Sequence, residues 1–137
     1  MNIAHIISTF PPYPGGMGNS VYQSVLEIGN LGYDNTVYTP AYDNRHAREE
    51  QLAPGVRLIR LKPLLAIGNG AVLPQLVYRL GNFDVVHLHY PFYGTAELVL
   101  AALSLRRAFL LRKPKLVLHY HMDTIASGFK GLIFKLC

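Results

Sequence analysis

Short apolar runs bounded by turn-forming residues alternate with amphipathic stretches along this chain. One run, Val56–Leu61, alternates apolar and basic residues, so we expect a half-solvated strand near a sheet edge. The polar, turn-rich residues 41–55 predict a long loop. Together the runs predict five strands, at Asn2–Ser8, Asn35–Thr39, Val56–Leu61, Asp84–Leu88 and Lys115–Tyr120.

The segments between these runs show helical periodicity. The first predicted helix follows the Pro/Gly-rich segment Thr9–Gly18, is capped by Asn19 or Ser20, and ends before a left-handed Gly32. The helix at Thr95–Leu111 is apolar nearly all round, which indicates that it is largely buried. Two further helices are predicted at Ala71–Leu80 and Ile125–Leu136.

This alternation predicts a Rossmann-like α/β fold, with a doubly wound parallel sheet covered by helices on both faces. With the strands numbered along the chain, we expect the order 3-2-1-4-5. The 137 residues fit one domain. The last predicted helix has no stop signal, so we expect this domain, residues 1–137, to be incomplete at its C-terminus.

Composition limits the class of protein. Half of the residues are apolar and 15% are charged, which is enough to bury a core. No run reaches the ~18 apolar residues of a spanning helix, and Met1–Ser8 lacks the basic residues of a signal peptide. The single cysteine, Cys137, excludes an intrachain disulfide. A cytoplasmic location is therefore the default expectation.

The net charge of +5 is concentrated at one end of the chain. Residues 106–137 hold seven Lys or Arg against one acid, whereas residues 1–105 are near neutral. Basic and apolar residues together fit peripheral contact with an anionic membrane, at its inner face, and an ordinary solvated face is the alternative. We expect no nucleic-acid partner.

Ligands of such sheets bind beyond the carboxyl ends of the strands, where the strand order reverses. Gly15 and Gly16 precede a helix, whose N-terminus offers free N–H groups to an anion, although a tight turn would also need glycine. The spacing departs from Gly-x-Gly-x-x-Gly because Val21 stands at the last position. The order 3-2-1-4-5 places three segments at this crevice: Gly15-Gly16, His89-Tyr90-Pro91 and His121-Met122-Asp123.

Histidines form a second signal. His87 and His89 share one strand face, as do His119 and His121, and two such pairs could bind zinc. We expect no metal, because His87 and His119 lie within strands and are predicted to pack in the core. His121, at a strand end, is the better candidate, as a hydrogen-bond donor or a general acid or base.

Three segments together resemble the N-terminal domain of glycosyltransferase family 4, of the GT-B fold: Phe10–Gly16, Asp84–His89 and Leu116–Asp123. The resemblance implies transfer of a sugar, of the hexosyl type, from a nucleotide diphosphate sugar to a sugar or lipid-linked acceptor. It implies a role in glycan or glycolipid biosynthesis, without a cofactor beyond this co-substrate.

Positions that match the family carry its roles. Gly15 and Gly16 match a glycine pair beside the donor diphosphate and the acceptor, and His121 matches a histidine near the donor sugar. We take His121 as the catalytic candidate, and Gly15, Gly16, His89, Tyr90 and Asp123 as substrate-binding candidates.

The chain departs from the family in two respects. These 137 residues match no part of the family's donor-binding C-terminal domain, which we expect to be absent, and we therefore expect this chain alone to be inactive. Met17-Gly18-Asn19 stands where an acidic residue is common. Two other functions stay open: a non-catalytic Rossmann-like module that binds an anionic ligand, and a His-rich metallohydrolase.

Overall fold

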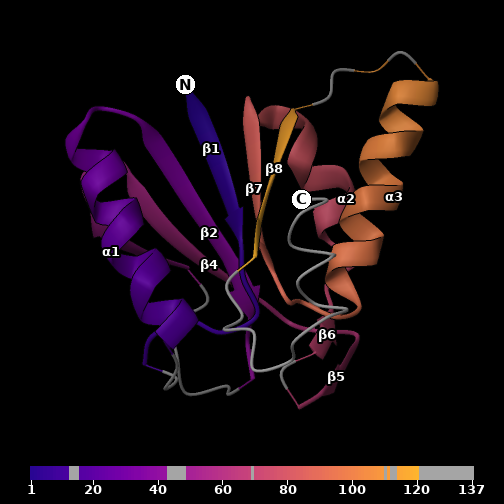
Figure 1. Cartoon of the computed structure of the whole chain (residues 1–137), viewed down its shortest axis with the longest axis horizontal. Helices are drawn as coiled ribbons and strands as arrows, with labels where there is room; N and C mark the ends of the chain where they lie inside the picture. Colours follow the sequence, from indigo (N-terminus) through magenta and orange to yellow (C-terminus); the bar gives the residue numbers. More distant parts are fainter. Residues whose placement is uncertain (13–15, 43–48, 69, 110, 112–113, 121–137) are drawn as a thin grey trace, which may run out of the picture.

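The computed structural model describes the whole chain except residues 13–15, 43–48, 69, 110, 112–113 and 121–137. Its centre is a six-stranded sheet in the order β3-β4-β2-β1-β7-β8 (Figure 1). The predicted α/β fold is therefore confirmed. The bounds of these strands are Asn2–Ile6 (β1), Asp34–Pro40 (β2), Glu49–Ala53 (β3), Val56–Leu61 (β4), Val85–Tyr90 (β7) and Lys115–Tyr120 (β8).

The parallel part of the sheet has the predicted strand order. β4, β2, β1, β7 and β8 pair in parallel, and they are the third, second, first, fourth and fifth predicted strands. β1 lies in the middle, where Ile3 pairs with Asn35 on one side and with Val85 on the other. The strand order reverses at this point, and the carboxyl ends of the strands beside such a reversal are where folds of this kind bind ligands.

β3 and β4 correct two expectations. Residues 49–53 were expected in a loop, but they form β3, which runs antiparallel to β4 and places Glu50 opposite Leu58. β4 is not half-solvated, and Arg57 is its one exposed residue. The reason is that both faces of β4 are packed: Leu58 joins the core on one side of the sheet and Ile59 the core on the other.

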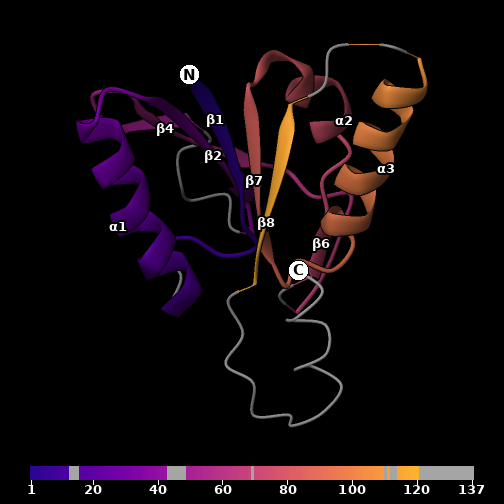
Figure 2. The ribbon, with the colours of Figure 1, turned by 45° about the horizontal axis from the view of Figure 1, so that its top comes forward.

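Helices cover both faces of the sheet (Figures 1 and 2). On one face, α1 (Gly16–Asn30) packs Val21 and Val25 against Ile7 of the loop after β1 and against β2 and β4. On the other face lie α2 (Leu76–Arg79), the 3-10 helix η1 (Leu80–Asn82) and α3 (Thr95–Ala108). Successive residues Ile6 and Ile7 thus enter opposite cores, as expected for extended chain.

The start of α1 differs from the prediction, whereas its end agrees with it. The helix begins at Gly16, so Asn19 and Ser20 lie inside it and do not cap it. At the other end Gly32 has φ of 93°, as predicted for a left-handed residue after the helix, and its N–H donates to the carbonyl of Gly29 at 3.0 Å.

The predicted helix at 71–80 is confirmed only in its second half, from Leu76 onward. A hairpin of β5 (Leu65–Ile67) and β6 (Gly70–Val72) precedes the single turn of α2. Gly94 bridges to Ala71 and has φ of 91°, and a Cβ at Gly94 would lie 2.8 Å from the Ala71 carbonyl oxygen. This backbone contact holds residue 71 in strand geometry, which the helical spacing of its apolar neighbours could not reveal.

α3 confirms a helix at residues 95–108 but not its expected burial. Leu100 and Leu105 are 43% and 57% exposed, because only one side of the helix packs on the sheet. The predicted helix at 125–136 lies outside the described residues.

Candidate functional site at the carboxyl edge of the sheet

The loop after β1 and the first turn of α1 lie at the carboxyl ends of the strands, as the topology predicts (Figure 1). Gly16 is the first residue of α1 and is exposed. A Cβ there would meet no described atom within 4 Å, and Gly16 is not among the described glycines with a left-handed backbone. Among the described residues, nothing therefore covers the position of a Gly16 side chain, and a left-handed turn does not explain the glycine here. Gly15 lies outside the described residues.

Gly18, in the same turn, matters for packing, although it was not predicted to be a site residue. Gly18 is buried, and a Cβ there would lie 2.9 Å from the Thr9 carbonyl oxygen and 3.2 Å from the Phe10 Cα. Only glycine lets the first turn of α1 pack directly on the loop backbone. The spacing Gly16-x-Gly18 was the available signal, since two glycines in one helical turn suggest a close approach.

Two side chains hold the loop between β1 and α1. The Arg60 guanidinium is 4% exposed, and its Nη2 donates to the Pro11 carbonyl oxygen at 2.6 Å. The Tyr42 hydroxyl donates to the Ser8 carbonyl oxygen at 3.0 Å. Arg60 comes from β4, whose alternating basic residues indicated solvent exposure, so no pattern in the sequence pointed to this role.

Four histidines gather on one face of β1, β7 and β8. His5 is opposite His87 in the register of β1 and β7, and His89 is opposite His119 in that of β7 and β8. His5 and His89 are 1% and 2% exposed, His87 is half-buried and His119 is exposed. The expectation that His87 and His119 pack in the core is therefore wrong, because no described helix covers this part of the face.

The hydrogen bonds of the buried pair assign the ring protons. The Asn35 Nδ2 donates to the Tyr33 carbonyl oxygen at 3.2 Å, so its Oδ1 faces the Nε2 of His5 at 2.9 Å as an acceptor. His5 must then carry its proton on Nε2 and accept on Nδ1, from the Nε2 of His89 at 3.2 Å. Burial lowers the pKa of His5 below 6.5, and the bond to Asn35 offsets part of that shift. His5 is thus neutral.

Of the predicted substrate-binding residues, Tyr90 lies at the carboxyl end of β7 and His89 lies just inside it. The Tyr90 ring stacks on Tyr120 with centroids 5.7 Å apart and meets Tyr93 edge-on at 5.9 Å. Burial raises the pKa of the Tyr90 phenol, and Tyr93 raises it further. These three rings form an uncharged aromatic surface at the edge. His121 and Asp123 lie outside the described residues, so their placement stays a prediction.

An apolar cavity of about 460 Å³ adjoins this aromatic surface. The β5–β6 hairpin forms one side and Tyr93 and Gly94 the other. Leu65 and Ile67 line it and are 57% and 74% exposed. The hairpin lies at the same end of the molecule as the carboxyl ends of the strands (Figure 1). The edge therefore combines an open helix N-terminus with an aromatic and apolar surface.

Comparisons with known proteins agree with this architecture. The family model described as "Glycosyltransferase Family 4" matches residues 14–135. A structure of sucrose-phosphate synthase from Thermosynechococcus elongatus is similar at a TM-score of 0.64 and 18% identity, over 98% of this chain and 39% of that one. A second structure of that synthase gives a TM-score of 0.60 and 19% identity, over 89% of this chain and 64% of that one. A comparison with curated sequences finds no match. The fold is therefore that of a portion of a GT-B protein.

Proposed function

The chain belongs to glycosyltransferase family 4, and from this membership we propose that it is the acceptor-binding N-terminal domain of an enzyme that transfers a sugar from a nucleotide diphosphate sugar. The observation that carries the proposal is the open first turn of α1 at Gly16, beside the carboxyl ends of β1 and β7. The transferred sugar is a hexose, and the acceptor is a sugar or a lipid-linked sugar used in glycan or glycolipid biosynthesis.

The helix N-terminus supplies the electrostatic part of the mechanism. The first N–H groups of an α-helix have no partner within the helix, and the 15-residue α1 directs them and its partial positive charge at the edge. A diphosphate can approach this backbone because Gly16 has no side chain. Gly15, the matching glycine before it, takes part in the same contact.

The acceptor binds on the aromatic and apolar side of the edge. Tyr90 presents a ring face and a protonated hydroxyl, which suit a sugar ring and its hydroxyl groups. The cavity beside Tyr93 suits an apolar portion of the acceptor. In this proposal His121 donates a hydrogen bond to the donor sugar, Asp123 accepts one from a substrate hydroxyl, and His89 fixes the strand end beneath them.

The donor is held mainly by a second domain. The chain spans 39% and 64% of the two synthase chains it matches, and the whole enzyme's activity is therefore part of the proposal. Transfer requires both substrates in reacting geometry, which contributes several kcal/mol to lowering the barrier. We expect the 137-residue chain alone to show no sugar transfer.

A peripheral contact with an anionic membrane, from the cytoplasmic side, also belongs to the proposal. Arg107 and Lys115 are exposed beside Phe109 and Leu111, which are 71% and 56% exposed. This basic surface lies at the end of the molecule opposite the carboxyl edge (Figure 1). No helix among the described residues is long and apolar enough to cross a membrane.

Gly16→Val in the complete enzyme tests the proposal. The added side chain points into open space, so the fold should persist, while it blocks the approach of the diphosphate. We expect kcat/KM to fall at least 100-fold, or ~2.7 kcal/mol. Ser24→Val, at an exposed position of the same helix, is the matched control and should keep full activity. Normal turnover by Gly16→Val would refute the proposal, and anion binding without transfer by the complete wild-type protein would favour the non-catalytic module.

A further inference from the structure

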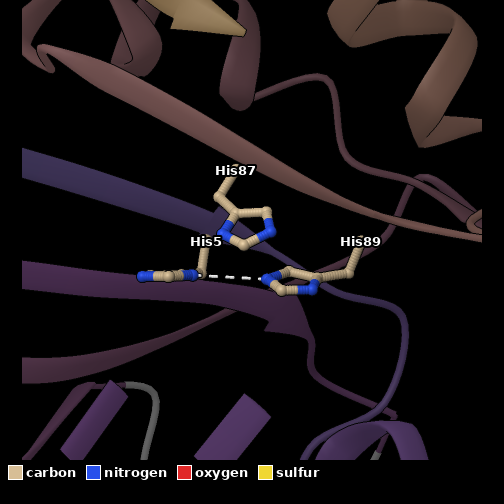
Figure 3. Close-up of side chains that lie close together, drawn as sticks. All are labelled: His5, His87 and His89. Carbon is tan, nitrogen blue, oxygen red and sulfur yellow. Dashed lines mark hydrogen bonds between the residues drawn. The ribbon is translucent and has the colours of Figure 1, made fainter. Parts of the chain in front are cut away.

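We propose that His5, His87 and His89 form a binding site for a divalent transition metal of the zinc type. One ring nitrogen from each of the three histidines lies within 4.8 Å of the others. Two of the residues come from β7 and one from β1, and the rings face one another in a single group (Figure 3). The site shares His89 with the proposed sugar-binding edge, but it rests on the histidine geometry alone and its test measures metal binding rather than sugar transfer.

The spacing of the nitrogens suits tetrahedral coordination. With Zn–N bonds of ~2.0–2.1 Å, two ligand nitrogens of a tetrahedral site stand ~3.3–3.4 Å apart. The Nδ1 of His5 and the Nε2 of His89 are 3.2 Å apart. The Nε2 of His87 is also 3.3 Å from the Nδ1 of His119, an exposed residue that is not one of the three.

The partner of His5 already has the form of an outer-shell group. Metal-binding histidines almost always donate their other N–H to a carboxylate, a carbonyl or water, which fixes the tautomer and the ring orientation. The Nε2 of His5 donates to the Asn35 side-chain oxygen at 2.9 Å, and the Asn35 amide is itself fixed by the Tyr33 carbonyl. The lone pair of His5 Nδ1 is therefore directed into the histidine group.

Metal binding requires two local changes in the group. His89 donates from Nε2 in the metal-free arrangement, so it must move that proton to Nδ1 before Nε2 can bind a metal. The rings of His87 and His89 stack with centroids 4.1 Å apart, so His87 must turn about its Cβ–Cγ bond. Both changes involve side chains only. Neutral imidazoles carry no charge, so the ion itself supplies the only charge that binding adds to the site.

The ligand chemistry selects the ion. Imidazole nitrogens suit Zn²⁺, Cu²⁺ and Ni²⁺, whereas Mg²⁺ and Ca²⁺ prefer oxygen ligands. The group of three contains only imidazoles. A bound ion would link β1 to β7, the two strands between which the strand order reverses. The expectation of no metal was based on two pairs, His87 with His89 and His119 with His121, and it left out His5.

Isothermal titration calorimetry of the complete, chelator-treated chain with ZnCl₂ tests the site. We expect one zinc ion per chain and no binding of MgCl₂. His87→Gln, at a half-buried position, should weaken zinc binding at least 30-fold. Asn35→Ala should weaken it ~10–100-fold, as loss of an outer-shell partner does. Glu50→Gln, at an exposed position of β3 and not a member of the group, is the control for chance binding and should leave the affinity unchanged.

Circular dichroism confirms that each variant is folded before it is titrated. Absence of saturable zinc binding by the wild-type chain would overturn the proposal. So would equal affinity of folded His87→Gln and wild type, because adventitious binding would then explain the signal. If His87→Gln does not fold, NMR of the wild-type chain replaces it: zinc should shift the imidazole resonances of His5, His87 and His89, and unchanged resonances would overturn the proposal.

Discussion

Replacing Gly16 and Gly18 separately by alanine distinguishes an open position from a packed one within a single helical turn. At Gly18 the new Cβ would lie 2.9 Å from the Thr9 carbonyl oxygen, about 0.5 Å short of the 3.4 Å at which ordinary contact begins. Since the neighbouring atoms belong to the backbone, they cannot rotate away. At Gly16 the new methyl group meets no described atom within 4 Å.

The two substitutions should therefore change stability in opposite directions. Overpacking of this kind costs ~1–3 kcal/mol, and alanine returns up to ~1 kcal/mol relative to glycine inside a helix. Gly18→Ala should lower the free energy of unfolding by about 1–2 kcal/mol. Gly16→Ala should be neutral or raise it by up to about 1 kcal/mol, because the unfolded chain loses conformational freedom.

Urea unfolding, followed by circular dichroism, measures both effects. With an m-value of ~2 kcal/mol/M, Gly18→Ala should lower the midpoint by ~0.5–1 M relative to wild type. An unchanged m-value would show that the difference lies in stability rather than in the denatured state. Equal midpoints for the two variants, within about 0.2 M, would refute the argument that Gly18 permits a close backbone contact.

Three further outcomes are expected. Arg60→Met should lower the free energy of unfolding by about 1.5–3 kcal/mol in urea titrations, because the buried Pro11 carbonyl loses a charged donor. Arg57→Met, on the same strand, removes an exposed ion pair and should lower it by only about 0–1 kcal/mol, so equal losses in the two variants would contradict the prediction. Burial raises the pKa of Tyr38 above 10.0 in the folded state, so the unfolded state releases its proton first and stability should fall as the pH rises through 10.0, less steeply in Tyr38→Phe. The chain should sediment with anionic vesicles at low salt and less so after Arg107→Gln with Lys115→Gln, and unchanged sedimentation would show that these residues make no membrane contact.

The parallel sheet was accessible from the sequence because its strands are nearly continuous apolar runs. The run that became β1 is buried on both faces, the run that became β7 is buried on one face and partly on the other, and the order of the strands follows the doubly wound pattern. β3 was missed because Glu49–Ala53 carries no apolar pattern of its own and is a strand only through pairing with β4. The helix predicted at 71–80 begins only at Leu76, because Pro74 and the contact between Ala71 and Gly94, rather than the spacing of apolar residues, decide the structure of the first half of this segment.

The candidate site was only partly predictable for a related reason. Gly16 begins the helix after β1 and Tyr90 is the last residue of β7, so topology alone places them at the edge. His5 sits in an apolar run, and its partner His89 is 84 residues away, so no local pattern could connect them. Arg60 resembles an ordinary surface cation until the fold supplies the Pro11 carbonyl, 49 residues away.

The central position of β1 also determines when each of its two edges can pair during translation. Ile3 and His5 can pair with β2 once residue 38 has left the ribosome, but their other neighbours, Val85 and His87, are made about 80 residues after them. At synthesis rates of ~5–20 residues per second, that interval lasts ~4–16 s. Throughout it one side of β1 offers unpaired backbone groups next to apolar side chains, a surface to which a chaperone could bind. β7 ends this exposure when it emerges, and the chain can then close its sheet around the strand that was synthesised first.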